Sequence, residues 1–179
     1  MINLIIFFKG LLGDNMPEEL KLKIQEIFQL LKQENWTMAS AESFTGGGFA
    51  NTITNVSGSS AVFLGSLVTY TNEMKHDFLD IDERIFKKYG AISKECATAM
   101  VVGCQKKTIA NLTVAFTGNA DRNVSENKPA FAGFIAIKLN DQEPEIFEFK
   151  QENTMNMNRE LFKELAINFA IEKILGLLS

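Results

Sequence analysis

The sequence predicts an α/β fold, a layered sandwich with a mixed sheet. Short apolar segments alternate with segments in which apolar residues recur at every third or fourth position, as expected for strands alternating with amphipathic helices. Two apolar segments, 131–139 and 144–150, are separated by four polar residues, which indicates an antiparallel hairpin. The chain has 179 residues, 46% of them hydrophobic, which suffices for one domain with a sizeable core.

The first helix is expected over residues 17–34. Pro17 suits a first helical position, and the acidic residues that follow it complement the helix dipole. The other elements expected in this half are a strand over 36–41, a glycine turn leading to a helix that ends near residue 53, a loop over 56–60 and a buried strand over 61–70.

In the second half, Ser93 is expected to cap a long helix that runs to Lys107. A strand ending in Thr-Gly and a final helix beginning near residue 158 are also clear in the pattern. The complete set is helices over 72–79 and 81–89, the helix after Ser93, a strand over 112–116, a polar loop over 119–128, a hairpin of 131–139 with 144–150, and the final helix.

Residues 1–15 are interpreted as an N-terminal extension, peripheral to a single domain over 16–179. The segment is apolar but too short to span a bilayer, and it lacks a positively charged start and a cleavage site. We therefore expect a cytoplasmic protein that makes no membrane contact.

Composition excludes several classes of ligand. The chain has 18 basic and 22 acidic residues and a formal charge of -4, with no basic stripe, so direct binding of nucleic acid is not expected. Cys96 and Cys104 lie on one predicted helix at a spacing unsuited to a disulfide or a metal site. His76 is the only histidine, which excludes multi-histidine metal sites. We expect no cofactor.

Residues 40–47, Ser-Ala-Glu-Ser-Phe-Thr-Gly-Gly, place a small hydroxyl residue between a strand and a glycine-rich helix start. The N–H groups at a helix N-terminus are unpaired and favour negative charge, either a phosphate or a developing oxyanion. Ser43 would face such a site. Taken alone, the same residues also suit an ordinary cap or turn.

A second candidate motif lies at residues 68–75, where a strand is expected to end at Tyr70 and a helix to begin near Asn72. Asn72 and Lys75 are three positions apart, so both can face one spot on that helix. The alternative interpretation is that Asn72 is an N-cap, Lys75 a solvated side chain and Tyr70 an edge aromatic.

Five segments in order are similar to the CinA C-terminal-domain family, and the resemblance extends over residues 17–179. The matching segments are 40–47, 56–65, 68–75, 90–93 and 116–118. The resemblance implies a three-layer α/β/α sandwich with a mixed, mainly parallel sheet of about five to six strands. It also implies a homo-oligomeric, metal-independent hydrolase of pyridine nucleotide salvage, which converts nicotinamide mononucleotide to nicotinate mononucleotide and ammonia.

Carried over by position, the resemblance places the nucleophile at Ser43, with Tyr70 and Lys75 beside it. A serine hydroxyl needs an adjacent base, and Lys75 is the candidate, with Tyr70 as a relay or orienting group. His76 is the competing base, but adjacent helical positions point about 100° apart, so only one of the two can face Ser43. Glu42 could orient Lys75, cap a backbone N–H or bind substrate.

The substrate is an anionic nucleotide, so phosphate donors are expected in addition to oxyanion donors. Hydroxyl and amide groups of Ser57, Ser59 and Ser60 are candidates for the phosphate, although such a segment is also ordinary loop chemistry. The other substrate-binding residues expected are Glu42, Thr45, Gly46, Gly47, Asn72, Thr117 and Gly118, with the N–H groups of 45–47 holding the oxyanion.

Two departures from the family pattern lie at the expected site. After Gly118 the family continues with a glycine-rich turn, whereas this chain has Asp121 and Arg122, which cannot copy glycine geometry. Phe44 stands where a small cysteine is common and could fill part of the pocket. Arg122 could instead supply charge for a phosphate. The alternative function is therefore a catalytically silent homologue that binds a nucleotide or a protein partner.

Overall fold

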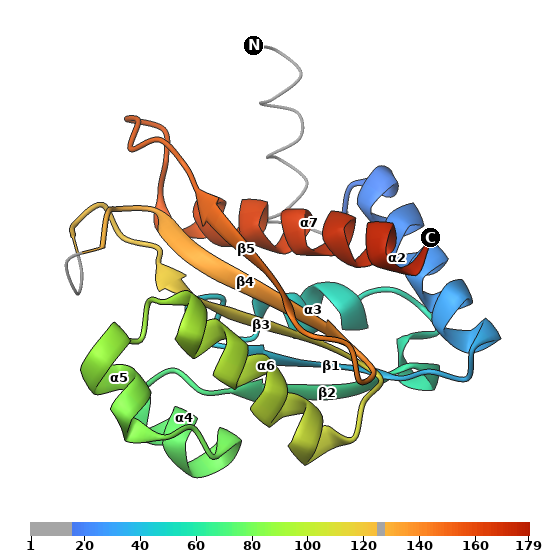
Figure 1. Ribbon diagram of the computed structural model, residues 1–179. Helices are drawn as coiled ribbons and strands as arrows, with labels where there is room; N and C mark the ends of the chain where they lie inside the picture. Colours follow the sequence, from blue (N-terminus) through green and yellow to red (C-terminus); the bar gives the residue numbers. More distant parts are fainter. Residues whose placement is uncertain (1–15, 125–127) are drawn as a thin grey trace.

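The computed structural model describes residues 16–124 and 128–179, and the prediction made for residues 1–15 lies outside them. A sheet of five strands lies between two layers of helices (Figure 1). The strands are β1 (Met38–Glu42), β2 (Phe63–Val68), β3 (Leu112–Asn119), β4 (Ala132–Leu139) and β5 (Glu145–Lys150). The α-helices are α2 (Glu18–Gln33), α3 (Gly48–Thr54), α4 (Asn72–Leu79), α5 (Glu83–Tyr89), α6 (Lys94–Thr108) and α7 (Arg159–Leu178), with a short 3-10 helix η1 (Ser59–Ala61).

The sheet order is β2-β1-β3-β4-β5. β1 pairs in parallel with both β2 and β3, whereas β3 with β4 and β4 with β5 are antiparallel. The predicted three-layer sandwich with a mixed sheet is confirmed, and two of its four strand pairs are parallel and two antiparallel. The reason is that the predicted terminal hairpin pairs directly with β3, so it contributes two antiparallel pairs to the sheet.

The two faces of the sheet have different cores. Along β1, Met38 belongs to a core rich in phenylalanine that lies under α2, α3 and α7. Ala39 and Ala41 point to the other face, where α6 contributes Cys96, Met100 and other residues of a smaller core. This alternation follows from the period of two in a strand. Small alanines let α6 pack close to the centre of the sheet.

β2 differs from its prediction. We expected a buried strand over 61–70, but β2 is an edge strand of six residues, and the side chains of Leu64 and Val68 are 54% and 42% exposed. A continuous apolar run is typical of a strand covered on both faces. Here the run ends at the sheet edge, where neither helical layer covers it fully.

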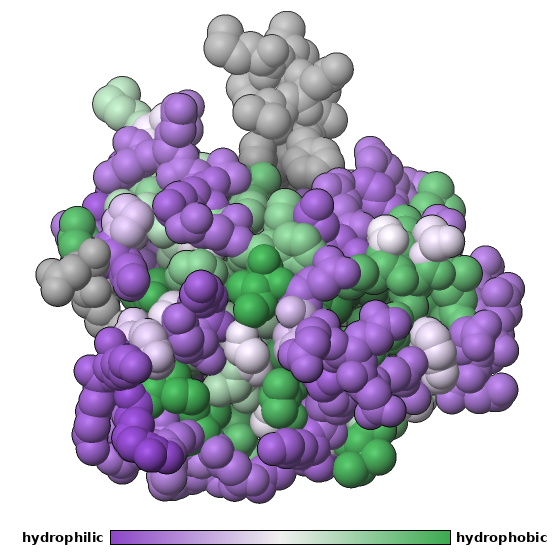
Figure 2. Space-filling model, in the orientation of Figure 1, coloured by the Kyte–Doolittle hydropathy of each residue, from purple (hydrophilic) through white to green (hydrophobic). Residues whose placement is uncertain are grey.

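The prediction that both cysteines are buried is confirmed, because Cys96 and Cys104 lie on α6 and are buried. Burial raises the pKa of the Cys104 thiol to about 12. Figure 2 shows that hydrophilic side chains cover most of the face that carries α4, α5 and α6, with apolar side chains visible between them. Among the helices of the described ranges, none has the length and apolar content needed to cross a bilayer.

Candidate active site

The carboxyl ends of β1, β2 and β3 meet at one end of the sheet. Glu42, the last residue of β1, is in register with Val68 of β2 on one side and with Phe116 of β3 on the other. All three strands are parallel, so the residues that follow them emerge together. This is why Ser43, Tyr70 and Gly118, far apart in sequence, lie at the same edge.

Ser43 and Lys75 form a buried pair. The Lys75 Nζ lies 3.0 Å from the Ser43 Oγ, and it also donates to the Tyr70 carbonyl oxygen at 3.0 Å. The Ser43 hydroxyl is 3.4 Å from the same carbonyl. Ser43 is 7% exposed and Lys75 is 1% exposed. The structure thus brings the predicted nucleophile and the predicted base within proton-transfer reach of each other.

α4 aims Lys75 inward and leaves His76 outside. The Thr71 hydroxyl caps this helix by accepting from the Met74 N–H, so Asn72 is not the cap. Lys75 is buried, while His76 is exposed and its Nδ1 lies 2.8 Å from the Ile81 carbonyl oxygen. That carbonyl is the main cause that raises the pKa of His76. Of the two candidate bases, only Lys75 contacts Ser43.

Tyr70 contributes to the site in two separate ways. Its backbone carbonyl accepts from Lys75, a contact that the sequence did not predict. Its side chain is 56% exposed, and the hydroxyl accepts a hydrogen bond of 2.8 Å from the Arg159 guanidinium. The phenol therefore lies at the rim of the site, where it can contact a ligand.

Glu42 anchors the turn that carries the nucleophile. Its fully buried carboxylate accepts from the N–H groups of Gly47, Phe49 and Ala50 at 3.0, 3.1 and 2.9 Å. The hydroxyl groups of Ser40 and Ser66 lie on the same carboxylate. A carboxylate at a helix N-terminus is stabilised by these donors and by the dipole. Of the three roles predicted for Glu42, the structure shows the cap.

The glycine turn uses some of the donors predicted for the oxyanion. Gly46 donates its N–H to the Ser43 carbonyl at 3.1 Å, and the Gly47 N–H is held by Glu42. Both glycines have positive φ, 64° and 94°, a conformation that favours glycine. Among residues 16–124 and 128–179, nothing accepts from the N–H groups of Phe44 and Thr45. Within these ranges, the N–H groups of Phe44 and Thr45 are therefore the donors left without an acceptor beside Ser43, whereas those of Gly46 and Gly47 are occupied.

Phe44 does not fill the pocket, so this expectation was wrong. Its side chain is buried in the phenylalanine-rich core, with ring centroids 6.3 Å from Phe116 and 5.4 Å from Phe162. Room for the ring comes from Gly118 and Gly133, which are paired across β3 and β4. A Cβ on Gly118 would lie 3.1 Å from the Phe44 ring and 2.7 Å from the Gly133 Cα. A larger residue at position 118 would therefore collide with the neighbouring strand and with the Phe44 ring.

A polar cleft opens beside Tyr70. It holds about 350 Å³, and its lining residues are Tyr70, Gly118, Asn119, Ala120, Asp121, Asn123, Val124 and Arg159. Arg159 is the first residue of α7 and was not predicted from sequence. The sequence did contain a feature that could have indicated Arg159. Arg159 and Lys163 are two cations near the N-terminus of the final helix, where the helix dipole disfavours positive charge.

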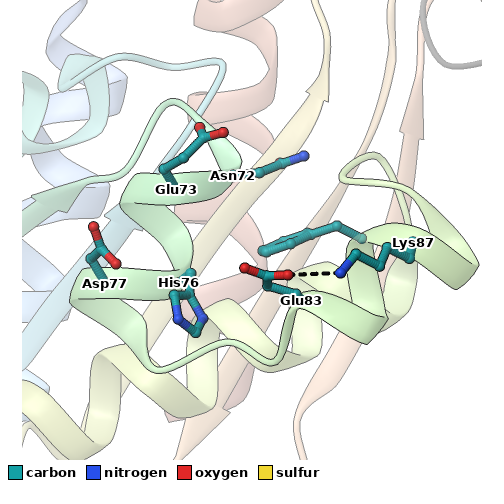
Figure 3. A pocket seen from close by; sticks show the side chains of 7 residues that line it. Asn72, Glu73, His76, Asp77, Glu83 and Lys87 are labelled. Carbon is teal, nitrogen blue, oxygen red and sulfur yellow. Dashed lines mark hydrogen bonds and ion pairs between the residues drawn. The ribbon is translucent and has the colours of Figure 1, made fainter.

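The remaining predicted residues take other places. Thr117 is buried and donates from its hydroxyl to the Ala91 carbonyl at 2.6 Å, so it fixes the segment before α6. Asn72 lines a different hollow of about 480 Å³ between α4 and α5, together with His76 and Glu83 (Figure 3). The hydroxyl of Thr45 is buried and has no partner in the described parts of the chain.

Ser57, Ser59 and Ser60 are not at the site. They lie before β2 begins, at the end of the sheet where Met38 of β1 pairs with Phe63. A Cβ on Gly58 would lie 3.4 Å from the Lys32 Nζ at the end of α2. Because β1 spans the sheet between these serines and Ser43, we exclude them from the phosphate site.

Arg122 is also used elsewhere. Its guanidinium donates to the Asn153 side chain at 3.2 Å and to the carbonyl oxygens of Thr154, Met155 and Met157. It therefore ties the loop after β3 to the segment that leads into α7. Within residues 16–124 and 128–179, no group of three His, Cys, Asp or Glu side chains is placed to hold a metal ion.

Comparison with known proteins identifies the family. Residues 21–178 match the CinA C-terminal domain. This chain belongs to that family. A protein of Halalkalibacterium halodurans named as competence-damage inducible is 37% identical over 153 residues, which are 86% of this chain and 36% of that protein. A CinA-like protein of Prochlorococcus marinus is 34% identical over 94% of this chain and 38% of its own length.

Solved structures of CinA proteins share the fold. The competence/damage inducible protein CihA of Agrobacterium tumefaciens superimposes with a TM-score of 0.85 at 27% identity, covering 93% of this chain and 100% of that one. A CinA superfamily protein of Escherichia coli gives 0.83 at 22% identity, covering 92% and 94%. The chain spans less than two fifths of the length of the curated relatives named above.

Proposed function

We propose that this CinA-family domain is an amidohydrolase that converts nicotinamide mononucleotide to nicotinate mononucleotide and ammonia. The observation that carries the proposal is the contact of 3.0 Å between the Ser43 hydroxyl and the buried Lys75 amine, beside an open polar cleft. A serine beside a lysine removed from water is an arrangement suited to nucleophilic attack on a carbonyl carbon. The proposed role is in pyridine nucleotide salvage.

In the first step Lys75, as a neutral amine, accepts the Ser43 proton while Oγ attacks the carboxamide carbon. Burial penalises the ammonium relative to the amine, which suits this role. The electron pair of the carbonyl moves to its oxygen, and the N–H groups of Phe44 and Thr45 are placed to donate to it. When the tetrahedral intermediate collapses, the carbon–nitrogen bond breaks and Lys75 returns the proton to departing ammonia.

The second step releases the product. Lys75 accepts a proton from water as the water oxygen attacks the ester carbon. The bond to the Ser43 Oγ then breaks, the proton returns to this oxygen, and the nicotinate carboxylic acid ionises in water. The Tyr70 carbonyl keeps Lys75 in place during both steps. Lys75 thus carries the transferred proton in both steps, and the final ionisation releases one proton to water.

Two observations favour an active enzyme over a silent homologue. The Phe44 ring lies in the core and is not among the residues that line the cleft beside Tyr70. The described residues of the loop that departs from the family pattern, Asp121 and Val124 among them, line the cleft. Both departures noted in the sequence are thus compatible with substrate access.

The test is ammonia release from nicotinamide mononucleotide by the purified protein and by Ser43→Ala. We expect steady turnover by the wild-type protein and a loss on the order of 10³-fold or more in the variant, because the nucleophile is removed. His76→Gln, one position from the base but outside the site, should retain turnover. Comparable rates for Ser43→Ala and His76→Gln would refute the mechanism.

A further inference from the structure

Thr69 has a buried hydroxyl group for which the proposed steps give no role. The residue directly follows β2, and it is 1% exposed. Within residues 16–124 and 128–179, its Oγ1 has no hydrogen-bond partner, although the atom is shielded from solvent. A buried hydroxyl without a partner costs free energy. Groups of this kind are rare in native proteins, so this one calls for an explanation.

The pairing of β1 with β2 places Thr69 next to Ser43. Glu42 is in register with Val68 in this parallel pair. The Thr69 N–H donates to the Glu42 carbonyl oxygen at 2.9 Å, so the pairing continues for one residue beyond the two strands. Ser43 and Thr69 are therefore neighbours on adjacent backbone segments, which lie roughly 5 Å apart.

The side chains of Ser43 and Thr69 point to the same face of the sheet. The residues before them, Glu42 and Val68, both face the Gly47 turn. The Glu42 carboxylate accepts from the Gly47 N–H at 3.0 Å, and a Cβ on Gly47 would lie 3.7 Å from the Val68 Cγ2. Because successive side chains of a strand alternate between its faces, the next residue of each strand points to the opposite side.

Lys75 reaches Ser43 from that opposite side, where α4 lies. Its Nζ is 3.0 Å from the Ser43 Oγ and 3.0 Å from the Tyr70 carbonyl oxygen. The Thr69 hydroxyl, next to Ser43 on the same face, thus belongs to the buried layer that holds the amine. Thr69 and Lys75 are each 1% exposed, whereas Ser43 is 7% exposed. Thr69 is therefore shielded from a substrate that reaches Ser43, and it can affect the reaction only through a neighbouring group.

We propose that Thr69 is a positioning residue for Lys75, linked to the amine by one buried water molecule. The inference rests on the proposed function, because it takes Lys75 to be the base of that reaction. A buried water molecule typically bonds to polar groups that protein atoms leave unsatisfied, and the Thr69 hydroxyl is such a group. The water accepts a hydrogen bond from the ammonium that forms when Lys75 takes the Ser43 proton. This bond stabilises the ammonium and keeps it directed at the reacting atoms.

The experiment measures the pH dependence of Ser43 acylation by p-nitrophenyl acetate and of ammonia release from nicotinamide mononucleotide. The activated ester reports on Ser43 and its base without requiring the proposed substrate. The rate should rise with pH as Lys75 loses its proton. In Thr69→Val, which keeps the shape but removes the hydroxyl, we expect this rise to occur about one pH unit lower and the plateau to fall about threefold to tenfold. The reason is that the ammonium is less stabilised and the amine is a weaker base.

Two further variants separate this role from a purely structural one. Thr69→Ser, which keeps a hydroxyl, should retain the pH profile of the parent. Thr113→Val is the matched control, because Thr113 is a buried threonine whose hydroxyl donates to the Val101 carbonyl oxygen at 3.2 Å. Its loss should lower the Tm by about 2 to 4 °C and leave the pH profile unchanged. Thr69→Val should show the reverse, an unchanged Tm and a shifted profile.

A Thr69→Val profile that coincides with that of the parent overturns the inference, even when the wild-type protein releases ammonia. An equal shift in Thr113→Val overturns it as well. If Thr69→Val shifts the profile with the activated ester but the wild-type protein releases no ammonia, the role of Thr69 stands and the proposed function fails. A wild-type protein that reacts with neither compound at Ser43 overturns both.

Discussion

The two ends of the parallel strands carry serines in very different settings. At the carboxyl end, Ser43 is buried and contacts the Lys75 amine. At the amino end, Ser57 and Ser60 are exposed in a loop near the end of α2. This difference shows that a serine-rich segment does not by itself indicate a catalytic or binding site. Chemistry gathers where strand ends and the N-termini of the following helices converge, because unpaired donors and buried side chains meet there.

The size of a hollow is an equally poor guide. The hollow between α4 and α5 holds about 480 Å³ and exceeds the cleft beside Tyr70, which holds about 350 Å³. Yet the larger hollow is lined by exposed side chains such as His76, and Lys75 turns away from it to contact Ser43. The smaller cleft is lined by Tyr70, whose carbonyl oxygen accepts from the Lys75 amine that contacts Ser43.

The largest effect on turnover is expected from substitutions at Lys75. Lys75→Met should lower turnover by on the order of 10³-fold, because the serine loses its base. Lys75→Arg keeps a cation but cannot be deprotonated, so it should be equally inactive. Ammonia release measured across pH checks both. An active Lys75→Arg would show that the site needs only a positive charge.

Phe44 tests whether the residue after the nucleophile serves packing or the pocket. Phe44→Ala should lower the free energy of unfolding by about 3 to 5 kcal/mol, because it leaves a cavity in the core. Turnover of the folded fraction should change little. Urea unfolding, with ammonia release measured below the transition, checks this. Increased turnover without lost stability would mean that the ring obstructs the cleft after all.

A substitution at Glu42 tests how the turn after β1, at the carboxyl end of the parallel strands, is stabilised. Glu42→Gln places an amide N–H₂ among three backbone donors, which should cost about 2 to 3 kcal/mol of stability and disturb the turn that carries Ser43. Both unfolding and turnover should therefore be affected. Glu34→Gln, on the surface after α2, is the control and should unfold like the parent. Equal stability of the two variants would contradict the cap.

The smallest effect is expected at the other end of the sheet. Replacing Ser57, Ser59 and Ser60 together with alanine should leave the KM for nicotinamide mononucleotide within about twofold, because these residues lie across the sheet from Ser43. Steady-state kinetics measure this. A tenfold rise in KM would show that these serines contact the substrate after all.

Much of the fold could be predicted because its signals are local. The helix from Asn72 to Leu79 and the cap at Ser93 agree with the structure, as does the terminal hairpin. β2 was misjudged because burial at a sheet edge depends on neighbours that the strand's own residues do not reveal. Arg159 was missed because its partners, Tyr70 and Asp121, lie far from it in sequence.

The sequence by itself determined the order of the elements, because helical period and caps are fixed over a few positions. Its resemblance to the CinA C-terminal-domain family selected Ser43, Tyr70 and Lys75 and favoured Lys75 over His76. Only the tertiary structure decided that Glu42 is a cap, that Phe44 belongs to the core and that α7 borders the cleft. Each of these depends on which segments the sheet brings together, and that is settled by packing over long separations in the chain.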